Sequence, residues 1–277
     1  MSIPVNKLIS RCSGTFVIHQ LPCFYNQYLV FMKNVPLLIS GAILIFSFNA
    51  CKKTNEDFQT ASISEYAPFT VGKYITYQLD SLVYVNFGAS SVVRSYEVKY
   101  MVDAEITDNL NRPAYRIIRY IRKSPATTFT PDATYEAVNT TGSLEFKDNN
   151  ERYIKLKLPI RNGYSWKGNT YIDTYSLNSE VRYLDDWDYI YDSVGLPATI
   201  GTFNLENTIT VNQRDEVIGS PDDINAYNEF NKGVEKYAKD IGLVYRLFFH
   251  SEYQPPTPGR GGYYQGYGIT LTMIDHN

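Results

Sequence analysis

The sequence predicts a mainly β protein: a single domain of curved antiparallel sheet, half-barrel or sandwich-like, with one short helical insertion. Two observations predict it. Apolar and polar residues alternate with a period of two over much of the chain beyond residue 66, as in strands with one buried face. The chain also has 25 tyrosines, and tyrosine favours half-buried positions on pleated sheets.

The alternation marks the strands in order. The first follows a turn at 68–73 and places Ile75, Tyr77 and Leu79 on one face. Further alternating segments lie at 96–103, 115–122, 154–158, 205–211 and 269–273. In segment 154–158, Lys155 and Lys157 alternate with the apolar residues and are expected on the opposite face. Short turns such as 109–113, without a long helical period, favour antiparallel pairing.

One helix is predicted at residues 220–233. Ser220 can cap its first turn, and Gly233 could end it. Three apolar side chains would share one face: Ile224, Tyr227 and Phe230. So short a helix needs packing against the sheet to be stable.

An apolar segment near the N-terminus divides the chain. Residues 35–48 are 14 residues that follow one positive charge, Lys33, and lead to Ala50 and Cys51. This length suits a signal-peptide core and is short of the roughly 20 residues of a membrane-spanning helix. The stretch resembles the lipobox of bacterial lipoproteins, which implies cleavage before Cys51 and a lipid on its thiol.

This interpretation divides the chain into four segments. Met32 followed by Lys33 is a natural start for a signal peptide, so residues 1–31 are expected to be a misassigned N-terminal extension; the alternative is a longer leader or second anchor. Residues 32–50 would then be the signal peptide. A flexible tether at 51–65 and a β-rich domain at 66–277 follow.

Three fragments occur in order behind the lipobox. They are Pro68-Phe69-x-x-Gly72-x-Tyr74-x-x-Tyr77, Leu158-Pro159-Ile160-x-x-Gly163-x-x-Trp166-x-Gly168-Asn169 and Tyr237-Ala238-Lys239-Asp240-Ile241-Gly242-Leu243-Val244. Together they resemble uncharacterised outer-membrane or periplasmic lipoproteins of the Bacteroidota type. The resemblance implies a lipid anchor in the outer membrane, facing the periplasm or the cell surface, and implies no activity. The strand texture is also similar to LolA/LolB-like half-barrels, which shelter acyl chains.

Charge and motifs narrow the function classes. The net charge of −3 gives the chain no electrostatic reason to bind nucleic acid. No phosphate-binding glycine loop, Gly-x-Ser-x-Gly elbow or His-Glu-x-x-His helix is present in the sequence. Only His250 and His276 follow the signal segment, and both are expected to be incidental. We therefore predict no cofactor, metal or catalytic residue, while leaving enzymatic activity open.

Two segments are candidates for ligand contact. Residues 185–192 combine acids and aromatic rings, which suit calcium ligation beside a sugar platform; the simpler interpretation is a strand with a solvated acidic edge. Residues 254–268 read as a long exposed loop that could contact a glycan, peptide or membrane, or could be an inert hairpin connection. The candidate residues are Asp186, Trp187, Asp188, Tyr189, Tyr191, Tyr263, Tyr264 and Tyr267.

Two serines are candidates for modification. Asp80-Ser81-Leu82 and Asp192-Ser193-Val194 resemble the short O-glycan acceptor of exported proteins of this bacterial type.

The function expected from these observations is a non-catalytic binding or structural lipoprotein of the cell envelope. The alternatives are a carbohydrate-binding or glycan-hydrolysing surface lipoprotein, and an acyl-lipid carrier with a half-barrel cavity. The expected partners are the membrane, through the lipid anchor, and a glycan, lipid or envelope protein.

Overall fold

The computed structural model describes residues 60–277. The N-terminal extension, the signal peptide, Cys51 and most of the tether lie outside the described residues.

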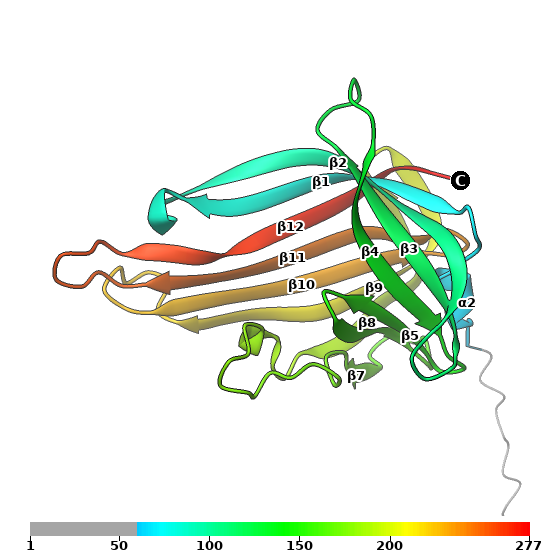
Figure 1. Ribbon diagram of the computed structural model, residues 1–277. Coiled ribbons are helices and arrows are strands. Elements are labelled where there is room, and N and C mark those ends of the chain that lie inside the picture. Colours follow the sequence, from blue (N-terminus) through cyan, green and yellow to red (C-terminus); the bar gives the residue numbers. More distant parts are fainter. Residues whose placement is uncertain (1–59) are drawn as a thin grey trace, which may run out of the picture. The chain divides into compact units, whose positions relative to one another are not determined.

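The described part of the chain forms one antiparallel sheet of twelve strands, nearly closed into a barrel (Figure 1). In chain order the elements are α2 (Ile63–Tyr66), β1 (Tyr74–Val85), the 3₁₀ turn η1 (Asn86–Gly88), β2 (Ser90–Thr107), β3 (Pro113–Arg122), β4 (Thr130–Asn139), β5 (Ser143–Asp148), β6 (Glu151–Lys157), β7 (Ser165–Lys167), the 3₁₀ turn η2 (Arg182–Leu184), β8 (Asp188–Ile200), β9 (Phe203–Gly219), β10 (Asn228–Ala238), β11 (Gly242–Gln254) and β12 (Tyr263–His276). The predicted curved antiparallel sheet is confirmed. All strands belong to one sheet, so the half-barrel form is the one found.

The strand order is β6-β5-β4-β3-β2-β1-β12-β11-β10-β9-β8-β7. Each strand therefore pairs with its neighbours in the chain, and β12 returns to pair with β1. In Figure 1 the long strands β9 to β12, β1 and β2 lie side by side, while β3 and β4 turn across them. Only the step from β6 to β7 lacks a ladder of strand pairing.

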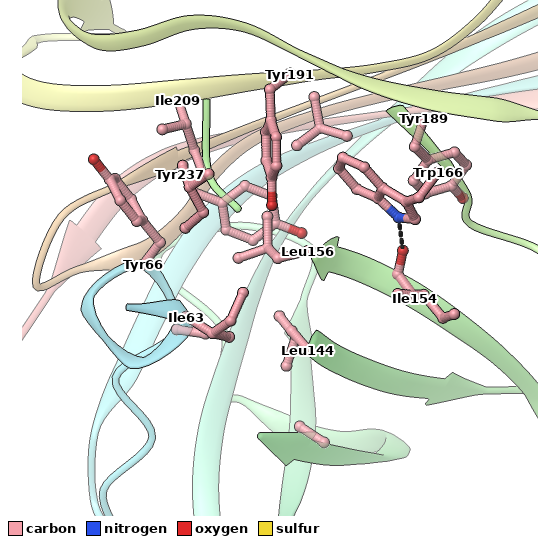
Figure 2. Packing of buried hydrophobic residues seen from close by; sticks show 14 of the residues in the cluster. Ile63, Tyr66, Leu144, Ile154, Leu156, Trp166, Tyr189, Tyr191, Ile209 and Tyr237 are labelled. Atoms are coloured by element: carbon pink, nitrogen blue, oxygen red, sulfur yellow. Dashed lines mark hydrogen bonds between the residues drawn. The ribbon is translucent and has the colours of Figure 1, made fainter. Parts of the chain in front are cut away.

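One backbone hydrogen bond and three that involve side chains close the gap between β6 and β7. The Ile154 N–H donates to the carbonyl of Gly168, at 2.8 Å. The indole N–H of Trp166 donates to the carbonyl of Ile154, also at 2.8 Å (Figure 2). The Tyr191 hydroxyl accepts from the Lys157 N–H at 2.8 Å and donates to its carbonyl at 2.9 Å. We call these contacts the seam; they satisfy backbone groups that an open sheet edge would leave unpaired.

Gly168 permits the close packing at the seam. A Cβ atom there would lie 2.4 Å from the ring of Tyr189, which the structure could not accommodate without shifting that buried ring. The missing side chain lets the ring of Tyr189 lie directly over the backbone. Trp166 then packs edge-on to Tyr189, with ring centroids 5.8 Å apart.

The buried apolar side chains form two clusters. The first surrounds the seam and joins α2 to both ends of the sheet (Figure 2). The second lies where β1 pairs with β12 and includes Tyr77, Val98, Leu271 and Met273. Burying each such side chain contributes about 1.5–3 kcal/mol. The two clusters therefore hold the sheet at its two joining points, the seam and the β1–β12 pair.

The prediction of a helix at residues 220–233 is wrong. Residues 220–227 form turns, and β10 begins at Asn228 and pairs with both β9 and β11. Pairing on two sides outweighs the weak helical propensity of a short segment, and Ile224 is left exposed. The helix found instead is α2, which falls at the end of the predicted tether. Its Ile63 and Tyr66 are buried, so folded structure begins before residue 66.

We predict that Tyr191→Phe lowers the free energy of unfolding by about 1–3 kcal/mol, because it leaves the N–H and carbonyl of Lys157 without their partner. Urea denaturation measures the change. Tyr171→Phe, which removes the hydroxyl of an exposed tyrosine, is the control and should change stability little. Equal effects of the two variants would show that the seam hydrogen bonds do not matter.

Candidate functional site

The curved sheet encloses a cavity of about 970 Å³. Its lining comes from β1 to β6 on one side and from η2, β8, β9, β11 and β12 on the other. This volume is at the upper end of the range for small-molecule sites, roughly 300–1,000 Å³. We call it the large cavity.

A small cavity of about 110 Å³ lies beside it. It is lined mainly by apolar side chains of β1, β2, β3, β5 and the segment that follows α2. Five residues line both cavities: Tyr100, Tyr135, Lys155, Arg246 and Leu271. The two spaces therefore meet at one set of side chains.

One wall of the large cavity is charged, and three of its cations are paired, whereas Asp148 and Glu151 form no ion pair within residues 60–277. Arg119 pairs with Asp132 across β3 and β4. Lys147 pairs with Glu136 at 3.3 Å. Arg116, on the same wall, pairs with Asp103 of the neighbouring strand β2. Most of the cationic charge on this wall is therefore neutralised by cross-strand partners.

The facing wall is aromatic. The ring of Tyr183 stacks on the buried His250, with centroids 3.8 Å apart. Its hydroxyl lies 3.3 Å from that of Tyr267, whose ring packs against Phe248. Trp187 also stacks on Phe248. The large cavity therefore has a flat aromatic surface opposite a polar one.

Three charged side chains form the floor between the cavities. The Lys155 ammonium of β6 donates to Glu235 Oε1 of β10 at 2.7 Å. The Tyr237 hydroxyl donates to Glu235 Oε2, also at 2.7 Å. Arg246 of β11 approaches the same carboxylate at 3.6 Å. We call Lys155, Glu235 and Arg246 the floor cluster.

The floor cluster keeps Glu235 ionised. Burial raises the pKa of Glu235, but attraction by Lys155 and Arg246 together with the two hydrogen bonds outweighs it, so the pKa lies below its ordinary value. Burial lowers the pKa of Lys155, and Glu235 opposes that effect. Arg246 stays charged because its pKa is raised above an already high value, with attraction by Glu235 and Asp148 outweighing burial.

Two buried donors near the floor have no partner among residues 60–277. They are Nε of Arg246 and Nε2 of Gln213. Gln213 is almost completely buried, and both side chains line the large cavity. Gly233 of β10 makes room for the Gln213 amide, because a Cβ atom there would lie 2.8 Å from Gln213 Oε1 and from the ring of Trp187.

The predicted cluster at 185–192 is divided by the alternation of β8. Asp186 and Asp188 are exposed and both pair with Lys167. The aromatic side chains Trp187, Tyr189 and Tyr191 are each about 1% exposed and point inward. The acids and rings therefore do not share a surface. Within residues 60–277, no group of three or more Cys, His, Asp or Glu side chains could hold a metal ion.

The aromatic rings of that cluster have structural partners. Trp187 donates its indole N–H to the carbonyl of Tyr183 at 2.6 Å, and Tyr189 donates to Asn169 at 2.9 Å. Both border the large cavity, but at about 1% exposure their rings are covered by neighbouring side chains and serve mainly to pack its wall. Tyr191 belongs to the seam.

The predicted loop at 254–268 is shorter than expected. Tyr263 already begins β12 and pairs with Gln254 at the end of β11, because the strand ladder continues past the glycines. Tyr267 lines the large cavity. Tyr264 instead stacks on Tyr84 outside it, and Tyr263 lies against the Arg260 guanidinium.

The two candidate serines lie in different settings. Ser81, in β1, is half-buried and lines the large cavity, so its hydroxyl is directed inward. Ser193, in β8, lies where pairing with β9 is interrupted between Asp192 and Leu196. Ser193 is half-buried like Ser81, so exposure does not distinguish the two serines.

Sequence reasoning missed the floor cluster. Lys155 alternates with apolar residues, which predicted a solvent-facing side chain, but both faces of β6 are covered and Ile154, Lys155 and Leu156 are all buried. Arg246 interrupts a largely apolar run of β11, whereas Glu235 lies in β10 among other charged residues. The charge of Arg246 inside that apolar run is the one signal that could have pointed to the cluster.

Comparison with known proteins assigns this chain to no family. No family model matches this chain, and a search of curated proteins finds no match. Among the helices of residues 60–277, none has the length and apolar character needed to cross a membrane.

We predict that Glu235→Gln lowers the free energy of unfolding by about 3–5 kcal/mol, because it leaves two buried cations without a carboxylate. Combining it with Lys155→Met should restore part of the loss. Thermal and urea unfolding measure both variants. Glu206→Gln, at an exposed position, is the matched control. A double variant no more stable than Glu235→Gln alone would contradict the coupling.

Proposed function

We propose that this chain is a non-catalytic binding protein of the cell envelope, which holds a small amphiphilic molecule inside its curved sheet. The observation that supports it most is the large cavity, about 970 Å³, joined through shared lining residues to an apolar cavity. A space with one aromatic wall, one polar wall and an apolar recess suits a ligand that has both polar and apolar parts.

Binding accounts better than hydrolysis for the paired carboxylates of the cavity. Asp132 and Glu136 are each held by a cation from a neighbouring strand. Glu235 is held by Lys155 and Tyr237. Carboxylates held in this way stabilise the wall and floor, so we assign them a structural role.

The envelope location is part of the same proposal. It rests on the apolar segment 35–48 and on Cys51, which resemble the signal and lipidation site of bacterial lipoproteins. A lipid on Cys51 would keep the cavity near a membrane, where amphiphiles are concentrated. An intact mass with an unmodified Cys51 thiol would contradict this part of the proposal alone.

A carbohydrate ligand is the second candidate. The flat rings of Tyr183 and Tyr267 face polar side chains across the large cavity, and such an arrangement can take the apolar face and the hydroxyls of a sugar. Oligosaccharides that displace a cavity-bound fluorophore would favour this candidate over an amphiphile.

The cavity can be tested with the fluorescent apolar amine 1-aminoanthracene on the full chain. We expect binding to the wild type, and at least about a tenfold loss of affinity in Ser81→Trp, because the indole would occupy the large cavity. Ser91→Trp is the matched control, since Ser91 is exposed on the adjacent strand β2. Urea unfolding of both variants separates cavity filling from loss of fold. Equal binding by both folded variants, or no binding to the wild type, would overturn the proposal.

A further inference from the structure

The floor cluster carries an excess of positive charge. It holds two cations, Lys155 and Arg246, and one carboxylate, Glu235. Glu235 is already satisfied by hydrogen bonds from Lys155 and Tyr237, each 2.7 Å long. Arg246, at 3.6 Å, lies beyond hydrogen-bonding distance of it. Arg246 therefore shares Glu235 as its counter-ion with Lys155, and its Nε, which borders both cavities, lies too far from that carboxylate for a hydrogen bond.

Two buried polar atoms that line the large cavity have no hydrogen-bond partner within residues 60–277, and both are donors. Nε of Arg246 and Nε2 of Gln213 are both N–H donors, and neither can accept a hydrogen bond. Buried donors left without an acceptor are unfavourable, and a ligand oxygen at either atom would remove that cost. Both side chains line the large cavity, but Nε and Nε2 are themselves covered, so a ligand oxygen would meet them only after each side chain rotates toward the cavity.

Nearby acids do not replace that missing acceptor. Asp132 and Glu136 are paired with Arg119 and Lys147 on the polar wall. Asp148 attracts Arg246 but forms no ion pair with it in the described part of the chain. The guanidinium of Arg246 can therefore bind an anionic ligand group.

The volume of the small cavity limits the size of the apolar part of such a ligand. It shares Lys155 and Arg246 with the large cavity, and otherwise it is bordered mainly by apolar groups such as Val102, Ile117 and Leu144. Its volume is about 110 Å³. An apolar cavity of roughly 150 Å³ binds benzene, so this smaller space limits the apolar part to at most one aromatic ring or a short alkyl group.

We infer that the ligand is an amphipathic carboxylate, whose anionic group binds at Arg246 with Gln213 as a further donor, and whose compact apolar end occupies the small cavity. This inference rests on the proposed binding function and assigns its ligand class. The remaining polar part of the ligand would extend into the large cavity, between its aromatic and charged walls.

The test compares two probes of nearly the same shape, 4-phenylbutanoate and 4-phenylbutanamide, as competitors of 1-aminoanthracene on the full chain. The carboxylate should bind roughly ten to a hundred times more tightly than the amide, because a charge-assisted hydrogen bond to a buried guanidinium is gained only by the acid. Arg246→Gln should abolish that preference while leaving amide binding in place. Arg246→Lys, which keeps the charge, should retain part of it.

The matched control is Arg94→Gln, which removes an exposed arginine of β2 that lines neither cavity and should leave the preference intact. If Arg246→Gln does not fold, Gln213→Leu provides the second variant and should weaken carboxylate binding with less effect on the amide. Equal competition by the two probes on the wild type, or an unchanged preference in folded Arg246→Gln, would overturn the inference. In either case 1-aminoanthracene binding would still stand, so this failure differs from failure of the proposed function.

Discussion

The ion pair between Lys155 and Glu235 joins opposite walls of the curved sheet from the inside. Lys155 comes from β6, at one end of the strand order, and Glu235 from β10 near the other. A buried pair of this kind contributes little net stability compared with apolar side chains of the same volume, although breaking it is costly. Its main consequence is chemical: it places charge in a space that the rest of the sheet would make apolar.

The seam and the floor cluster depend on each other. The seam brings β6 within hydrogen-bonding distance of the segment after β7, and it is this closure that puts Lys155 opposite Glu235. The closure uses an indole N–H and a tyrosine hydroxyl where a strand ladder would otherwise be expected. Because the two ends of the sheet are joined mainly by side chains, the interior keeps room for a cavity beside the packed core.

The same geometry explains why the aromatic residues divide into two roles. Trp166 and Tyr191 make the seam, whereas Tyr183, Trp187 and Tyr267 face the large cavity. Trp166, Trp187 and Tyr191 are buried and their polar atoms have hydrogen-bond partners, which is how tyrosine and tryptophan are tolerated inside proteins, whereas Tyr267 is partly exposed. An anionic ligand at Arg246 would lie between the aromatic wall of the large cavity and the wall that carries the ion pairs.

The sheet class, its antiparallel pairing and most strand positions could be predicted from the amino-acid pattern, because an alternation of apolar and polar residues is a local property of the chain. The pattern missed the helix at Ile63–Tyr66 and predicted one at 220–233, where local capping signals are weaker than pairing with β9 and β11. That Lys155, Gln213 and Arg246 line one cavity could not be predicted and follows from the folded sheet. The physical reason is that curvature covers the second face of β6, and a period of two cannot tell a face exposed to water from a face turned toward a cavity inside the sheet.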